Sequence, residues 1–172
     1  MNQKKLLIAD DSELNRALLV DMLGQDFSII EASNGKETIA ALQAHQGEIG
    51  VLLLDVVMPE MDGFEVLAAM NENHWIDDIP VIMISAETGS AYIDKAFKLG
   101  ALDYVSRPFM PNVIRRRIIN TVLLHAKKQQ ITDDPDRAGQ LAVSRAHLGI
   151  FRVMVIFYKQ TKQQVRHISH SL

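Results

Sequence analysis

The sequence predicts an α/β fold, a doubly wound five-stranded parallel sheet with helices on both faces, followed by a C-terminal extension. Two observations predict it. Short apolar runs alternate with helical patterns of about a dozen residues, the order of a parallel sheet with right-handed crossovers. Three of the runs are almost unbroken aliphatic segments, which is typical of strands covered on both faces.

Each element follows from its own pattern. Strands are expected at the apolar runs Leu6–Ala9, Phe27–Ala32, Val51–Leu54, Val81–Ile84 and Tyr104–Val105. Helices are expected at Glu13–Leu23, Lys36–His45, Phe64–His74, Ala91–Leu99 and, after Pro111, at 112–130. In the first helix the apolar residues Leu14, Leu18, Val20, Met22 and Leu23 roughly follow the helical period and leave Glu13, Arg16 and Asp21 for solvent.

Composition excludes several classes of protein. The 172 residues carry 18 Lys and Arg against 21 Asp and Glu, and the net charge of −3 gives no bulk attraction to nucleic acid or anionic lipid. The absence of cysteine excludes a disulfide scaffold and a cysteine-ligated zinc site. The apolar run after Lys5 is too short for a signal peptide or a membrane span. We expect a cytoplasmic protein that binds neither membrane nor nucleic acid.

A change in charge divides the chain. Residues 1–130 hold 12 basic and 18 acidic side chains, whereas 131–172 hold 6 basic and 3 acidic ones. The break falls at Asp133-Asp134-Pro135-Asp136, a cluster typical of a linker or turn. The sequence therefore predicts one domain at 1–128 and a linker with a short tail at 129–172. The tail has no recognisable output domain, and one hypothesis is that it is a truncated output remnant.

Polar residues end most of the predicted strands. The first strand runs into Asp10 and Asp11, the third into Asp55, the fourth into Ser85, and the fifth into Arg107 and Pro108. In doubly wound sheets, ligands bind outside the carboxyl ends of the strands. Three carboxylates within about 5 Å would repel by about 3 kcal/mol per pair at an effective dielectric of about 20. A cation must offset this repulsion, and an all-oxygen ligand set favours Mg²⁺.

These residues and their neighbours resemble a known family. The motifs that carry the likeness are Asp10-Asp11, Asp55-Val56-Val57-Met58-Pro59 with Asp62-Gly63-Phe64, Ser85-Ala86, and Tyr104-Val105-Ser106-Arg107-Pro108-Phe109. In order and spacing they resemble the receiver (CheY-like) domain of two-component response regulators over residues 4 to about 125. The resemblance implies the flavodoxin-like strand order 2-1-3-4-5.

The resemblance also implies a chemistry. Asp55 would accept a phosphoryl group from a sensor histidine kinase or a phosphotransfer protein. Asp10, Asp11, Asp55 and the backbone carbonyl of Val57 would hold Mg²⁺, which neutralises charge on the phosphoryl oxygens. Such a domain is a phosphoacceptor for signalling and not an enzyme in its own right.

Other residues would sense the phosphoryl group. Ser85 stands at the Ser/Thr switch position, and Tyr104 would be the aromatic residue coupled to it. Arg107 replaces the lysine usual in the family, keeps the positive charge and can bind phosphate in a bidentate way. The resemblance implies a cis bond between Arg107 and Pro108. Val57, two residues after Asp55, is apolar and cannot orient a hydrolytic water, which favours slow self-dephosphorylation.

The expected output surface comprises the fourth predicted helix, the fifth strand and the fifth helix, through which this family meets partners or forms homodimers. Three alternatives remain open. In the first, the chain is the receiver part of a regulator whose output, a cyclic-dinucleotide phosphodiesterase or a DNA-binding domain, is truncated. In the second, the protein binds DNA through the tail, although no helix-turn-helix is found there. In the third, it is an aspartyl-phosphate phosphatase, a class that would require an acidic residue at the position of Val57.

Overall fold

The computed structural model describes residues 4–132, with side chains as far as Gln129, and it confirms the predicted fold class. The strands are β1 Lys5–Ala9, β2 Ile29–Ala32, β3 Ile49–Asp55, β4 Val81–Ser85 and β5 Asp103–Ser106. They form a five-stranded sheet in the order β2-β1-β3-β4-β5, with every neighbouring pair parallel. This is the order that the resemblance implies.

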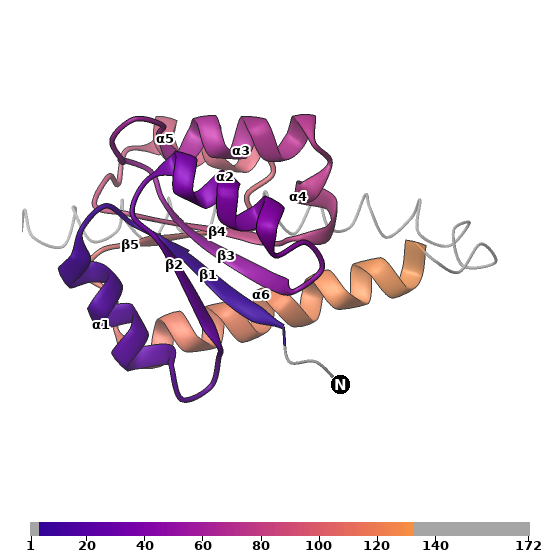
Figure 1. The fold of residues 1–172 in the computed structure, drawn as a ribbon, viewed down its shortest axis with the longest axis horizontal. Coiled ribbons are helices and arrows are strands. Elements are labelled where there is room, and N and C mark those ends of the chain that lie inside the picture. The colour runs from indigo at the N-terminus through magenta and orange to yellow at the C-terminus, as the bar shows by residue number, and fades with distance from the viewer. Residues whose placement is uncertain (1–3, 133–172) are drawn as a thin grey trace, which may run out of the picture. The chain divides into compact units, whose positions relative to one another are not determined.

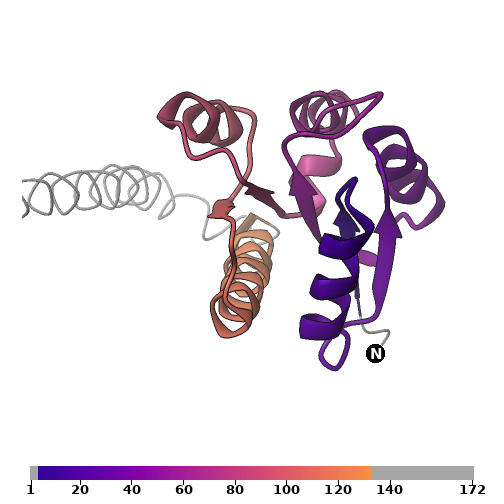
Figure 2. The ribbon, with the colours of Figure 1, turned by 90° about the vertical axis from the view of Figure 1, so that its left-hand side faces the viewer.

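The helices cover both faces of the sheet. They are α1 Glu13–Leu23, α2 Gly35–Ala44, α3 Gly63–Glu72, α4 Trp75–Asp78, α5 Ser90–Lys98 and α6 Pro111–Thr132. Figure 1 shows α2, α3 and α5 on one side of the sheet and α1 and α6 on the other. Figure 2 shows the same two layers along the sheet. Each connection between parallel strands is therefore a crossover through a helix.

The core consists of two apolar clusters, one on each face of the sheet. Alternate residues of a strand point to opposite faces. Leu52 of β3 therefore joins the cluster under α2, α3 and α5, while Leu53 joins the cluster under α1 and α6. Leu53 pairs in register with Ile8 on one side and Ile82 on the other, and all three side chains are fully buried. The central strands are thus held rigidly from both faces.

Polar caps start the helices directly after the strand ends. The Ser12 hydroxyl accepts a hydrogen bond from the backbone N–H of Asn15 at the start of α1. At the start of α3, Asp62 accepts from the N–H of Glu65, and the Glu65 carboxylate accepts from the N–H of Asp62. This reciprocal capping box satisfies N–H groups that the helix itself cannot pair. The caps fix where the loops that follow β1 and β3 end.

The structure corrects three details of the predicted elements. The short helix α4 was not expected, because its four residues carry too little periodicity. In α1, Leu14 and Leu18 were expected to face the core but are 79% and 44% exposed. Leu23 is buried as expected, Leu19 is buried although it was not predicted, and Arg16 lies on their stripe at helical spacing. Arg16 was expected to face solvent, but its side chain faces the protein.

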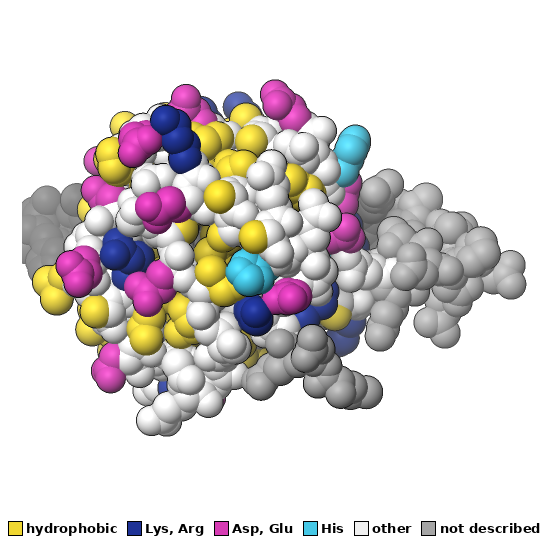
Figure 3. Space-filling model, viewed as in Figure 1, with side chains coloured by type: hydrophobic (Ala, Val, Ile, Leu, Met, Phe, Trp, Pro, Cys, Tyr) yellow, Lys and Arg dark blue, Asp and Glu magenta, His cyan; other side chains and the backbone are white. Residues whose placement is uncertain are grey.

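The surface of the described residues shows mixed charge. On the face drawn in Figure 3, acidic and basic side chains are interspersed among apolar ones. Within residues 4–132, no helix combines the length and the apolar character that crossing a bilayer requires. The greater part of the predicted tail, residues 133–172, lies outside the described residues.

Candidate functional site

Three carboxylates meet at the carboxyl edge of the sheet. Asp55 is the last residue of β3, and Asp10 follows β1, its neighbour in the sheet. One carboxylate oxygen from each of Asp10, Asp11 and Asp55 lies within 4.8 Å of the others. Asp10 and Asp55 are buried, while Asp11 is exposed. The structure thus brings together the three acids that the sequence placed at strand ends.

Burial perturbs the pKa of one of these acids. Removal of the Asp55 carboxyl from water raises its pKa from 3.8 to about 6, against the opposing attraction of Arg107, and the negative charge of Asp10 adds to the rise. A raised pKa shows that the negative charge on Asp55 is incompletely compensated. The cluster can therefore accept further positive charge.

Arg107 supplies a cation within the cluster. Its Nη2 donates to Oδ2 of Asp55 at 3.0 Å and also to Oδ2 of Asp10. The other oxygen of Asp10, Oδ1, accepts from the backbone N–H of Ser12 at 2.9 Å and from the side-chain amide of Asn15 at 3.2 Å. Asp10 is therefore fixed by three donors. Arg107 thus places a hydrogen-bonding guanidinium beside two of the three acids.

Ser85 and Tyr104 meet at a neighbouring loop. Ser85 ends β4, and its Oγ accepts from the backbone N–H of Glu87 at 3.1 Å. The Tyr104 hydroxyl donates to the carbonyl of the same residue, Glu87, at 2.7 Å, and burial raises the pKa of the tyrosine. The N–H of Arg107 donates to the Ser85 carbonyl at 2.8 Å, and the bond between Arg107 and Pro108 is cis. The side chains of Ser85 and Tyr104 thus bond to the same residue, one at the N–H and the other at the carbonyl of Glu87.

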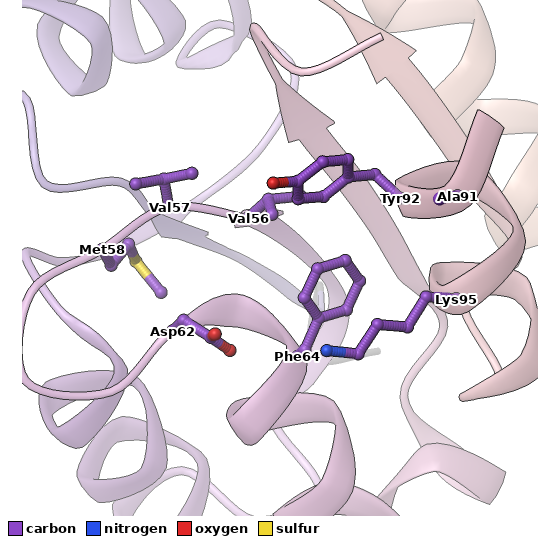
Figure 4. Close-up of a pocket in the computed structure, with 8 residues that line it drawn as sticks. All are labelled: Val56, Val57, Met58, Asp62, Phe64, Ala91, Tyr92 and Lys95. Carbon is purple, nitrogen blue, oxygen red and sulfur yellow. The ribbon is translucent and has the colours of Figure 1, made fainter. Parts of the chain in front are cut away.

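A pocket of about 470 Å³ opens beside the loop that follows β3. It is lined by residues after β3 and on α3 and α5: Val56, Val57, Met58, Asp62, Phe64, Ala91, Tyr92 and Lys95. Figure 4 shows Phe64, Tyr92 and Lys95 turned toward one another, with the two rings 6.1 Å apart and the lysine Nζ 4.1 Å from the Phe64 ring centre. Val57, more than half exposed, is part of the wall next to Asp55. The three residues that follow Asp55 in the sequence, Val56, Val57 and Met58, thus form an apolar part of the pocket wall.

Sequence reasoning missed Asn15 and Arg16. Arg16 Nη1 donates to the backbone carbonyl of Asp10 at 2.8 Å and lies 3.4 Å from that of Asp11. Its Nε pairs with Glu31 of β2 at 3.2 Å. The available signal was the spacing, because Arg16 lies three residues before Leu19 on the stripe that faces the sheet. The inward position of Arg16 could have been predicted only if the stripe of Leu19 had been identified as the one that faces the sheet.

The donor set fits a divalent cation. All of the grouped ligands are carboxylate oxygens, which suits a hard ion such as Mg²⁺. The exposed Asp11 leaves one side of the group open to water or a substrate, as Mg²⁺ sites that keep several waters require. The incompletely compensated charge on Asp55 is a further reason for a cation to bind there.

Fold and site together define a doubly wound α/β protein with an acidic site at the carboxyl edge of its sheet. The chain belongs to the response regulator receiver domain family, whose model matches residues 6–119. Receiver domains are the signalling domains of two-component systems. The chain is 33% identical over 117 residues to a chemotaxis protein CheY homolog of Campylobacter jejuni, covering 66% of this chain and 88% of that protein.

Two further relatives extend the comparison. A probable cyclic di-GMP phosphodiesterase of Vibrio cholerae is 36% identical over 118 residues, which are 69% of this chain but only 26% of that protein. The crystal structure of a CheX-CheY-BeF3-Mg²⁺ complex from Borrelia burgdorferi matches with a TM-score of 0.63 at 28% identity, covering 68% of this chain and 87% of that one. The Vibrio cholerae relative therefore matches over only about a quarter of its own length, 26%.

Proposed function

We propose that the protein is a phosphorylation-activated response regulator whose phosphoacceptor is Asp55. A carboxylate oxygen of Asp55 attacks the phosphorus of a phosphohistidine on a sensor histidine kinase or phosphotransfer protein. The new O–P bond forms as the N–P bond breaks, and the imidazole leaves with the electron pair. The observation that carries this proposal is the buried Asp55 carboxylate, grouped with two other acids and bonded to Arg107 at the sheet edge.

Asp10, Asp11, Asp55 and the backbone carbonyl of Val57 are the proposed ligands for Mg²⁺. The bound ion would supply charge neutralisation at the phosphoryl oxygens. The Borrelia burgdorferi relative, crystallised as a complex that includes Mg²⁺, supports this choice of ion. Hydrogen bonds from the Ser12 N–H and the Asn15 side-chain amide hold the Asp10 carboxylate in place before any ion binds.

Arg107, Ser85 and Tyr104 form the proposed response machinery. Arg107 already reaches the Asp55 carboxylate, so its guanidinium can bond to phosphoryl oxygens at the same place. The Ser85 hydroxyl can turn from its Glu87 contact to donate to a phosphoryl oxygen, and this shift releases the backbone that Tyr104 also holds. Phosphorylation then favours one of two arrangements of this loop.

The proposed output surface is the face of α5, β5 and α6, which corresponds to the fourth and fifth predicted helices with the strand between them. A homodimer or a partner protein would bind there. We further propose that residues 1–128 are the receiver domain, that 129–172 are a linker and tail, and that the protein acts in the cytoplasm. The chain spans about a quarter of the Vibrio cholerae relative, 26% of its length, so that an output of that kind is not part of this proposal.

Incubation with acetyl phosphate and Mg²⁺, followed by intact-mass measurement, tests the proposal. Wild type should gain the mass of one HPO₃ unit, because the Asp55 oxygen takes the phosphoryl group and acetate leaves. Asp55→Asn should gain none. Asp21→Asn, an exposed acid on α1, is the matched control and should gain the group as wild type does. Equal adducts on wild type and Asp55→Asn would remove Asp55 from its role, and loss of the adduct in Asp21→Asn would show a non-specific effect of charge.

A further inference from the structure

We propose that Arg16 is a positioning residue that fixes the loop of Asp10 and Asp11 for divalent-cation binding. This inference rests on the proposed function, because it assigns a partner to the metal-binding side chains of that site. Arg16 touches neither carboxylate. It holds the backbone on which the two carboxylates stand, with Nη1 2.8 Å from the Asp10 carbonyl and 3.4 Å from the Asp11 carbonyl.

The Arg16 side chain is itself held from two directions. It projects from the face of α1 that also carries the buried Leu19 and Leu23, and only 15% of it is exposed. Its Nε pairs with the carboxylate of Glu31 on β2, the strand next to β1. The guanidinium thereby links α1, β2 and the loop after β1. A planar, multiply donating group suits this task better than a point charge.

The positions of the two carboxylates follow from this arrangement. Asp10 and Asp11 are consecutive, and the directions of their side chains depend on the backbone between them. Oδ1 of Asp10 also accepts from the N–H of Ser12, the next residue in the same loop. A shift of the loop carbonyls would therefore move the Asp10 carboxylate and the exposed Asp11 carboxylate together.

Arg16 also contributes charge without occupying ligand atoms. Arg107 bonds to carboxylate oxygens of Asp10 and Asp55, which are both proposed cation ligands. Arg16 bonds to the backbone carbonyls of Asp10 and Asp11, so its positive charge lies near the acids and competes for none of their carboxylate oxygens. Groups that orient metal ligands from behind commonly set metal affinity, and their loss costs about 10–100-fold.

The fold contains a matched control at the other end of α1. Arg115 of α6 donates through Nη2 to the carbonyl of Met22 at 3.0 Å, and its Nε lies 2.8 Å from the Asp26 carboxylate. It thus combines a backbone carbonyl and an acid as Arg16 does, but at a distance from the acidic site. Loss of either arginine removes the same kinds of contact.

Mg²⁺ titration by isothermal calorimetry of the whole protein, compared among variants, tests the proposal. Arg16→Gln should weaken Mg²⁺ binding by about tenfold. Arg115→Gln should keep the Kd of wild type, while the urea midpoints of both variants fall together. Glu31→Gln leaves the Arg16 guanidinium present but removes its ion pair, and it should weaken Mg²⁺ binding by a smaller factor. This variant tests the proposal even if Arg16→Gln fails to fold.

A second measurement needs no metal. In the metal-free protein, hydrogen exchange at the Ser12 amide should be faster in Arg16→Gln than in Arg115→Gln, because the loop that presents this amide to Asp10 is freed. An Mg²⁺ Kd in Arg16→Gln equal to that of wild type, or equally weakened in Arg115→Gln, overturns the role of Arg16. Wild type that takes up no Mg²⁺ at all overturns the proposed function and this inference with it.

Discussion

The side chains of the sheet change from apolar in the interior to acidic at the carboxyl edge over a single step along the strand. Along β1, Leu6 to Ala9 are fully buried and apolar, and the next residue, Asp10, is as fully buried and carries a charge. The same step occurs in β3 between Leu54 and Asp55. Burial is therefore common to both regions, and only the chemistry of the side chain changes.

The comparison teaches that burial has opposite effects on the two regions. In the interior it removes apolar area from water and stabilises the fold by about 25 cal/mol per Å². At the edge it removes a carboxylate from water, which raises the pKa of Asp55 and disfavours its charged form. The edge holds its acids in place because the apolar interior behind them is rigid. Substitutions in each region should separate these effects.

The largest effect is expected in the interior. Leu53→Ala deletes a fully buried side chain packed between β1 and β4, and it should lower the free energy of unfolding by about 2–5 kcal/mol. Urea denaturation followed by circular dichroism measures it. Leu14→Ala removes the same atoms from a largely exposed position and should change stability by less than about 0.5 kcal/mol. Equal losses in the two variants would contradict the two-layer core described above.

A smaller effect is expected where the interior meets the edge. A Cβ on Gly63 would lie 2.1 Å from the carbonyl oxygen of Asp55, so backbone must move to admit it. Gly63→Ala should cost about 1–3 kcal/mol of stability and slow acceptance of a phosphoryl group from acetyl phosphate, because the displaced carbonyl belongs to Asp55, the proposed phosphoacceptor.

Gly89→Ala is the control for this substitution. The nearest atom to its added Cβ is 3.5 Å away on Tyr92, an ordinary contact. Stability and phosphoryl acceptance should both stay near those of wild type. A Gly63→Ala protein that loses stability but accepts the group at the wild-type rate would show that the strain does not reach Asp55.

Periodicity predicted most of the fold, and the positions of polar residues predicted most of the candidate site. Asp10, Asp55 and Ser85 were placed correctly at the edge because parallel strands all present their carboxyl ends there. The sequence could not show which stripe of α1 faces the sheet, since Leu14 and Leu18 have the same apolar character as Leu19 and Leu23. That choice depends on how α1 packs against the sheet, and the inward position of Arg16 was missed for the same reason.

The pairing of Arg107 was also beyond the sequence. Its charge was expected to meet a phosphoryl group, whereas in the structure one nitrogen bonds to both Asp10 and Asp55. The residue type alone predicted the positive charge of Arg107. Which groups Arg107 bonds to depends on how far β5 extends beside β4. The bond of the Tyr104 hydroxyl to the Glu87 carbonyl was not predictable either, because it joins strand β5 to the loop after β4 across 17 residues of sequence.

The smallest expected effect concerns the edge alone and depends on pH. The pKa of Asp55 is about 6 in the folded protein, against 3.8 for an ordinary aspartate. As pH rises from about 4 to about 6, the unfolded chain has released this proton while the folded chain still holds it, so folded stability falls. Asp55→Asn cannot ionise and escapes this fall. In metal-free buffer the variant should therefore gain stability relative to wild type across this interval.

The difference between the two proteins, followed by urea denaturation from pH 4 to pH 7, isolates this one group. Other carboxyls contribute with the opposite sign, since hydrogen bonds from Ser33 and from Lys5 lower the pKa values of Glu37 and Glu48, but they are common to both proteins and cancel. The gain should be smaller than the loss in Leu53→Ala and level off about one unit above pH 6, because the folded wild type is only half deprotonated at its pKa of about 6. Added Mg²⁺ should narrow it, because an ion bound by the folded wild type stabilises that state. A difference that stays constant across this pH range would mean that burial does not perturb Asp55, and the contrast between interior and edge would then fail at its central residue.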